Sequence, residues 1–110
     1  MNVVDILKRY SIEPSRYRDQ YFLTDGNILS KEVEYAGVNK EDVVLEIGSG
    51  IGNLTEKLAS KAKRVIAVEK DSRFCEVLSD RNISNIRIIQ GDILDIDVPD
   101  FDKVVSNVPY

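Results

Sequence analysis

The sequence has no histidine, no tryptophan and one cysteine in 110 residues. Without histidine it cannot contain a Ser-His-Asp triad, a Cys-His pair or an imidazole general base. A single cysteine, Cys75, excludes an internal disulfide and any metal site that needs several thiolates, and no metal is expected. The apolar neighbours of Cys75 on a predicted helix face inward, so we expect this thiol to fill core space rather than to react.

Long apolar runs are also missing. No segment approaches the ~20 apolar residues that a membrane-spanning helix needs, and the first residues lack the apolar core of a signal peptide. Together with the lone cysteine, this predicts a cytoplasmic protein with no membrane partner. The composition, 43% hydrophobic and 31% charged, is ordinary for a globular protein, and the length allows one domain at most.

Positive charge is scarce and unevenly placed. The formal net charge is −4. Basic side chains slightly outnumber acidic ones within the segment 1–24, whereas acidic side chains clearly dominate the rest of the sequence. A basic arm on an acidic body is compatible with a phosphate backbone that touches one edge of the protein. A solvated terminal segment is the simpler interpretation of the charge alone.

Short apolar segments alternate with amphipathic ones along most of the chain. This alternation predicts strands joined by helical crossovers, and hence a mainly parallel sheet. The strands are nearly continuous apolar runs, which is typical of a sheet covered on both faces. The predicted strands are 43–47, 65–69, 86–89 and 101–106. Two predicted helices have definite bounds, 3–10 and 72–80. Of the other two, one starts at a cap, Asp25 or Asn27, and runs to 36, and one is opened by Asn53 or Thr55 and runs to 62.

Three glycines, Gly48, Gly50 and Gly52, lie between the strand 43–47 and the next helix. Glycines at this place let a ligand approach the backbone closely. The dinucleotide fingerprint G-x-G-x-x-G fails, because Asn53 or Thr55 stands where it needs its last glycine or alanine. The G-K-[S/T] of a P-loop is absent as well. A pyrophosphate ligand is therefore disfavoured, and tight-turn packing is the alternative to a binding role.

Three carboxylates flank the predicted carboxyl edge of the sheet. Glu46 would repel a pyrophosphate but attract a cationic ligand, such as the sulfonium and ammonium of S-adenosylmethionine; alternatively it caps a backbone amide or pairs with a lysine. Glu69 ends the second strand, where an acid can accept hydrogen bonds from both ribose hydroxyls; the alternative is a surface carboxylate beside Lys70. Asp92 follows the third strand and could accept a hydrogen bond from an adenine amino group, although a simple turn role is nearly as well supported.

The segment Asn107-Val108-Pro109-Tyr110 follows the last predicted strand. Asparagine and proline after a strand are ordinary turn residues. A functional interpretation is more specific: the Asn107 side-chain carbonyl and a backbone carbonyl of Val108 or Pro109 could accept both N–H groups of a planar exocyclic amine and so free its lone pair. Tyr110 could stack on the base. This chemistry relies on orientation and needs no general base.

Together these motifs resemble the ribosomal RNA adenine N6-dimethyltransferases, which are related to the erythromycin-resistance methyltransferases. The resemblance is carried by residues 20–23, 44–52, 68–71, 91–94 and 107–110. The glycine loop and Glu69 are shared with the wider S-adenosylmethionine-dependent class. The resemblance to this particular family rests on Gln20-Tyr21-Phe22-Leu23 and on the final tetrad. The sequence departs from the usual family pattern at Asp19, where glycine is common, and at Tyr21, where histidine or asparagine is common.

The resemblance implies an α/β, Rossmann-like class I methyltransferase fold with a mostly parallel sheet, truncated after the fourth strand. Residues 1–37 would form an N-terminal helical cap segment, and 38–110 an incomplete S-adenosylmethionine-binding domain. The implied catalytic residues are Asn107, Pro109 and Tyr110. The implied cofactor contacts are Gln20, Tyr21, Leu23, Glu46, Gly48, Gly50, Gly52, Glu69, Lys70, Asp92, Ile93 and Asn107.

The activity implied by the resemblance is methyl transfer to the N6 amines of two adjacent adenosines near the 3′ end of small-subunit rRNA, with a role in ribosome assembly. The implied partner is small-subunit rRNA or the pre-ribosomal subunit, bound by a monomeric protein. Because the family continues past the tetrad, the 110 residues are expected to be a fragment with little activity alone. The alternatives are a methyltransferase of another exocyclic amine, such as DNA adenine, and a non-catalytic ribosome-assembly module.

Overall fold

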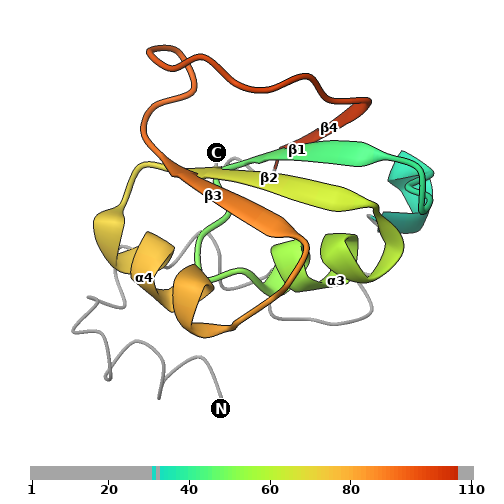
Figure 1. The fold of residues 1–110 in the computed structure, drawn as a ribbon, viewed down its shortest axis with the longest axis horizontal. Helices are drawn as coiled ribbons and strands as arrows, with labels where there is room; N and C mark the ends of the chain where they lie inside the picture. The colour runs from blue at the N-terminus through green and yellow to red at the C-terminus, as the bar shows by residue number, and fades with distance from the viewer. Residues whose placement is uncertain (1–30, 32, 107–110) are drawn as a thin grey trace.

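The computed structural model describes residue 31 and residues 33–106 (Figure 1). Four strands form one parallel sheet in the order β3-β2-β1-β4. The register places Leu45 of the central strand β1 between Ile66 of β2 and Val104 of β4. The predicted parallel sheet is thereby confirmed. The strands are β1 (Val43–Ile47), β2 (Arg64–Glu69), β3 (Ile86–Gln90) and β4 (Lys103–Ser106).

Two helices, α3 (Asn53–Lys61) and α4 (Ser72–Asp80), cover one face of the sheet (Figure 1). Asp71 caps α4, because its side chain accepts the backbone N–H of Arg73 at 2.9 Å. α3 begins after Gly52 with no side-chain cap. Both helices were predicted, α4 with the bounds that the structure shows. A third helical stretch, residues 33–36, ends at Gly37 as predicted; within the described ranges no helix is long and apolar enough to cross a bilayer.

The main core lies between the sheet and these helices. Every second residue of the central strands points to this side, so β1 contributes Val44 and β2 contributes Val65, both fully buried. Helix α3 packs Leu54 and Leu58 against them, as its spacing predicted. The buried members of this cluster are Val33, Val44, Leu54, Leu58, Ala59, Ala62 and Val65.

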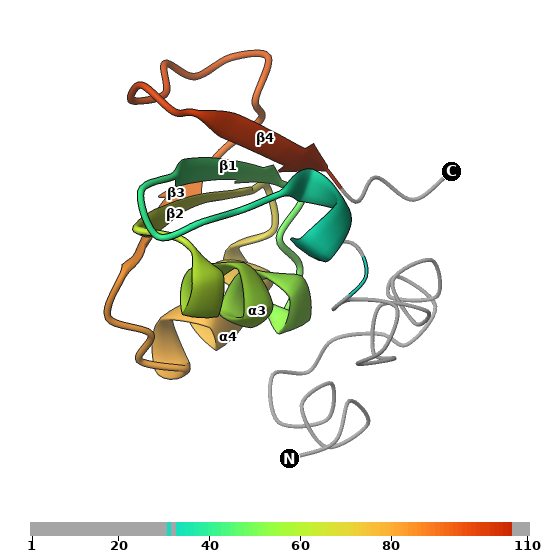
Figure 2. The ribbon, with the colours of Figure 1, turned by 90° about the vertical axis from the view of Figure 1, so that its right-hand side faces the viewer.

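The opposite face is covered differently. The segment between β3 and β4, residues 91–102, forms no helix and runs across this face (Figures 1 and 2). Its Ile93 and Ile96 pack against a second buried cluster that includes Leu45 and Ile66. The expectation of a sheet buried on both faces therefore holds for β1 and β2. It is wrong for β4, where Val104 is 54% exposed, because β4 is an edge strand of this sheet.

Candidate functional site

The carboxyl edge of the sheet brings the predicted site residues together. Because β1, β2 and β3 are parallel neighbours, the residues that follow them meet at one edge. The N–H of Gly48 donates to the Val68 carbonyl oxygen at 2.9 Å, and the N–H of Gly91 donates to the Glu69 carbonyl oxygen at 3.0 Å. At the same edge, Ser106 of β4 pairs with Ile47.

The glycine loop turns sharply from β1 into α3. Gly48, Gly50 and Gly52 all have left-handed φ angles, of 77°, 56° and 92°. Residues other than glycine are strained in this region. At Gly52 space is restricted as well, since a Cβ atom there would collide with Cδ2 of Leu78 on α4. Glycine at this position thus allows both the turn and the close approach of the two helices.

Glu69 closes the loop with its carboxylate. Oε1 accepts the N–H of Gly50 at 2.8 Å, and Oε2 accepts the N–H of Asp71 at 2.8 Å. The residue is only 7% exposed, so the alternative of a surface carboxylate is wrong. A carboxylate has about four acceptor positions, and these two bonds leave capacity for the hydroxyl groups of a ligand. The predicted ribose contact stays a prediction.

Glu46 lies inside β1 and is 1% exposed. The hydroxyl of Thr55 donates a hydrogen bond to its Oε1, which ties the strand to the first turn of α3. Thr55 was not predicted as a site residue, because nothing in the sequence shows that the two side chains meet. Direct attraction of a cationic ligand by Glu46 stays a prediction.

Asp92 takes part in a turn and faces its neighbouring strand end. Oδ1 accepts the N–H of Leu94 at 3.0 Å, which is the predicted turn role. Oδ2 lies 3.7 Å from Nζ of Lys70, so the two residues bridge the ends of β2 and β3. Ile93 is half-buried against the second core cluster. Adenine contacts by Asp92 and Ile93 stay predictions.

Ser49, in the glycine loop, was missed by sequence reasoning. Its residue is 8% exposed, and its hydroxyl has no hydrogen-bond partner in the part of the chain that the structure describes. Buried polar groups in folded proteins are nearly always hydrogen-bonded. An unsatisfied hydroxyl within the loop therefore marks a place where a polar group of a ligand would be favourable.

Arg81 was not predicted either, although it fixes the entrance to α3. From the end of α4, its Nη1 donates to Oε2 of Glu56 at 2.6 Å and its Nη2 donates to Oδ1 of Asn53 at 2.8 Å. The partners of Arg81 lie 25 and 28 positions away in the sequence, so no local sequence pattern predicts these contacts. They hold the first turn of α3, and with it the end of the glycine loop.

Cys75 is half-buried behind this edge. Its thiol donates to the Glu69 carbonyl oxygen, with Sγ and O 3.5 Å apart. Burial, together with the negative charges of Glu69 and Asp71, raises the pKa of the Cys75 thiol to about 11. The thiol is therefore protonated near neutral pH, which favours the predicted filler role over a reactive one.

Six predicted site residues lie outside the described part of the chain, and their roles stay predictions. They belong to the two end segments of the sequence, together with the basic arm and the helix predicted at 3–10. The six residues are Gln20, Tyr21, Leu23, Asn107, Pro109 and Tyr110.

A family model described as "Ribosomal RNA adenine dimethylase" matches residues 15–110. The chain belongs to this family. A curated member, "Probable ribosomal RNA small subunit methyltransferase A" of Methanosarcina mazei, is 54% identical over an alignment of 110 positions that covers 98% of this chain and 40% of the relative. The chain thus spans about 40% of the length of the curated relatives it matches.

Solved structures agree with this family and with the class I methyltransferase fold. A dimethyladenosine transferase from Plasmodium falciparum superposes with a TM-score of 0.72 at 38% identity, over 78% of this chain and 33% of that chain. A coclaurine N-methyltransferase bound to N-methylheliamine and SAH superposes with a TM-score of 0.66 at 28% identity, over 73% of this chain and 26% of that chain. The predicted Rossmann-like fold is confirmed.

Proposed function

We propose that a protein built on this chain transfers methyl groups from S-adenosylmethionine to the N6 amines of two adjacent adenosines in small-subunit rRNA. Family membership supports the reaction class and the RNA substrate. The observation that carries the proposal is the glycine loop closed against the Glu69 carboxylate, at the carboxyl edge of a parallel sheet. Work on small-subunit rRNA would place the protein with cytoplasmic ribosomes or their precursors.

The residues at this edge fit S-adenosylmethionine. The buried, unsatisfied hydroxyl of Ser49 and the uncapped start of α3 offer hydrogen-bonding groups beside the loop. Glu69 keeps acceptor capacity for the two ribose hydroxyls, and Asp92 lies at the neighbouring strand end. Glu46 adds a negative charge behind the loop, which suits a ligand with cationic groups. SAH, the demethylated product of this cofactor, is bound in the coclaurine N-methyltransferase.

The bound cofactor would supply the methyl group as a cationic sulfonium. This chain's residues would orient the two reactants: the edge from Gly48 to Asp92 holds the cofactor, and Asn107, directly bonded to Ser106, holds the target amine. The Asn107 side-chain carbonyl and the Pro109 backbone would accept the amine N–H groups, with Tyr110 stacked on the base. In each transfer the amine nitrogen held by Asn107 would take the methyl carbon from the sulfonium sulfur and lose one proton to solvent.

In this proposal, residues 1–37 form a cap segment in which Gln20, Tyr21 and Leu23 contact the cofactor, and residues 38–110 form the cofactor-binding part of the domain. Lys70 and Ile93 complete the set of cofactor contacts at the ends of β2 and β3. The protein acts as a monomer on rRNA or a pre-ribosomal subunit.

Cofactor binding is tested by calorimetry on the 110-residue chain with S-adenosylmethionine, and with NAD as the comparison ligand. We expect S-adenosylmethionine to bind and NAD to bind far more weakly. Glu69→Gln replaces one acceptor oxygen by an NH₂ group, which cannot accept from a backbone N–H, and should weaken S-adenosylmethionine binding at least about tenfold. Glu76→Gln, an exposed position on α4, is the matched control. Tight NAD binding would refute the proposed role of Glu46.

Methyl transfer is tested in a fusion of this chain to the part of the Methanosarcina mazei relative that the chain does not cover. We expect tritiated methyl groups to enter unmethylated small subunits and not duplex DNA. Asn107→Ala should abolish transfer with little loss of cofactor binding. Labelling of DNA in place of rRNA would show another amine target, and cofactor binding without any transfer would show a non-catalytic module.

A further inference from the structure

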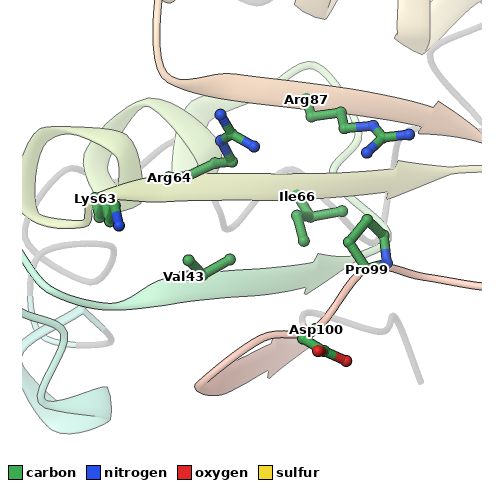
Figure 3. A pocket seen from close by; sticks show the side chains of 7 residues that line it. All are labelled: Val43, Lys63, Arg64, Ile66, Arg87, Pro99 and Asp100. Atoms are coloured by element: carbon green, nitrogen blue, oxygen red, sulfur yellow. The ribbon is translucent and has the colours of Figure 1, made fainter.

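A hollow of about 220 Å³ lies at the amino edge of the sheet, away from the proposed cofactor site (Figure 3). It opens on the face that α3 and α4 do not cover. Side chains of Val43 and Ile66 line it from neighbouring strands, and Pro99 lines it from the segment that leads into β4. The hollow therefore has an apolar lining.

Three cations surround this apolar lining. They are Lys63 and Arg64, at the start of β2, and Arg87 on β3, and all three are exposed. Arg64 and Arg87 project on the same side of the sheet as Ile66, because side chains alternate along a strand and Ile66 and Arg87 are register partners. Asp100 is the one carboxylate among the described residues that line the hollow.

These cations are available to a partner. Elsewhere in residues 31 and 33–106, four basic side chains are held in ion pairs: Lys70, Arg73, Arg81 and Lys103. No ion pair within the same residues involves Lys63, Arg64 or Arg87. Three such positive charges at one hollow, in a chain whose net charge is −4, form a local site for an anion.

The geometry points to RNA as the partner. We infer that the hollow binds the sugar–phosphate backbone of the RNA substrate, with a phosphate between Arg64 and Arg87 and a ribose or base edge against Ile66 and Pro99. Guanidinium groups suit phosphate oxygens because they can donate two parallel hydrogen bonds. A free inorganic anion would gain nothing from the apolar lining, and an apolar ligand would not need three cations. The identity of the polyanion as RNA rests on the proposed function.

The position of the hollow gives it a distinct task. β2 runs from Arg64 at the hollow to Glu69 at the cofactor edge, so the hollow and the cofactor edge lie at opposite ends of the same strand. An RNA segment held at the hollow therefore contacts the protein at a second place, while its target adenosine lies at the opposite edge. Phosphate contacts of this kind position a nucleic acid without reading its bases.

The test is RNA binding by the 110-residue chain, measured as the fluorescence anisotropy of a labelled RNA hairpin over a range of sodium chloride concentrations. The double variant Arg64→Ala/Arg87→Ala should raise the Kd at least about tenfold. It should flatten the slope of log K against log salt by about one, because the two guanidinium groups share one phosphate. The control Lys31→Ala/Lys57→Ala removes the same charge from residues that do not line the hollow, Lys57 lying on α3 behind the other face of the sheet, and should have less than about a twofold effect. Equal losses in both double variants would overturn the inference.

Two further arms keep the result interpretable. Thermal unfolding of each variant checks that it is folded; if the alanine pair is not, Arg64→Gln/Arg87→Gln replaces it with the same expectation. In the fusion, the hollow variant should raise the KM for RNA at least about fivefold and leave the affinity for S-adenosylmethionine unchanged. An unchanged KM for RNA would mean that other parts of the longer protein cover the hollow, and would refute the inference. Failure of the proposed function would appear separately, as no cofactor binding by the unaltered chain.

Discussion

At the scale of the residue, Glu69 combines a structural role with the proposed binding role in one carboxylate. Its two oxygens hold Gly50 and Asp71, on the two loops that follow β1 and β2. The loop geometry and the proposed ribose contact are therefore linked, and a substitution at Glu69 changes both.

Gly52 offers a residue-scale prediction with an internal control. Gly52→Ala combines a left-handed φ angle with a collision against Leu78, and should lower the free energy of unfolding by about 2–5 kcal/mol. Gly37 has a φ angle of 65° but open space around its Cβ position. Gly37→Ala should therefore cost only about 1–2 kcal/mol. Urea unfolding of both variants gives the comparison, and equal losses would show that packing between α3 and α4 is not what requires glycine at Gly52.

The raised pKa of Cys75 predicts slow alkylation. With the thiol pKa at about 11 in place of 9.0, the thiolate fraction at pH 8 falls about 100-fold. Iodoacetamide should therefore modify the folded chain about 100-fold more slowly than the chain in denaturant, as followed by intact mass. S-adenosylmethionine binding should survive Cys75→Ala. Rapid modification of the folded chain would contradict the burial of this thiol.

At the scale of the element, the two edges of the central strand are secured by different means. β1 pairs with β2 along its length, and the N–H of Gly48 in the glycine loop adds a hydrogen bond to Val68 of β2. Its start is tied to β4 by Lys103, whose Nζ lies 2.6 Å from both Oδ2 of Asp42 and the carbonyl oxygen of Gly37. The Asp42 carboxylate also accepts the N–H of Asn39 at 2.8 Å. One ion pair thus joins the turn before β1 to the last described strand.

This pair predicts a specific pH dependence. The ammonium of Lys103 and the N–H of Asn39 hold the pKa of Asp42 below its usual 3.8 in the folded chain. The stabilisation is therefore complete above the unfolded pKa, about 4, and is lost as the pH falls through the lower folded value. Asp42→Asn should reduce the stability near neutral pH and make it less sensitive to acid below about pH 4.

Chemical unfolding at a series of pH values measures this effect. Asp97→Asn, at an exposed position, is the control and should keep the pH dependence of the unaltered chain. If Asp42→Asn and Asp97→Asn show the same acid sensitivity as the unaltered chain, the Lys103 contact does not contribute to stability.

Elements were predictable where the signal is local. The apolar runs of β1 and β2 and the amphipathic spacing of α3 and α4 identify these elements, and Asp71 before α4 is a recognisable cap. The starts of the strands were predicted less accurately. β2 begins at Arg64, one residue before the predicted start, and β4 begins at Lys103, two residues after the predicted start.

The candidate site was predictable only in part. Its place at one edge followed from the parallel order of the strands, which put Glu69 and the glycine loop together. The contacts of Glu46 with Thr55, and of Arg81 with Asn53, depend on how the helices pack on the sheet. The hollow at Arg64 and Arg87 depends on the register of two strands and on a segment without regular structure. None of these has a local signature in the sequence.

At the scale of the whole molecule, the relation to longer family members yields one more prediction. The 110 residues correspond to about 40% of the Methanosarcina mazei relative. We expect the chain alone to bind S-adenosylmethionine but to methylate small subunits at less than about 1% of the rate of the fusion. The rate of transfer depends on how the amine is oriented toward the methyl group, and an amine held in the wrong orientation loses most of that rate. Scintillation counting of transferred tritium measures both. Multiple turnovers by the chain alone would contradict this expectation.

The strand order has a consequence for synthesis on the ribosome. β1, β2 and β3 pair in the order in which they are made, and among the described residues the hydrogen bonds of the loop at Glu69 join partners no later than Gly91. β4 joins afterwards, on the other side of β1. A nascent chain can therefore form the glycine loop and its contact with Glu69 while the residues after Gly91, among them Asp92 and Asn107 of the proposed site, are still being translated, so that the later strand adds to a template already folded.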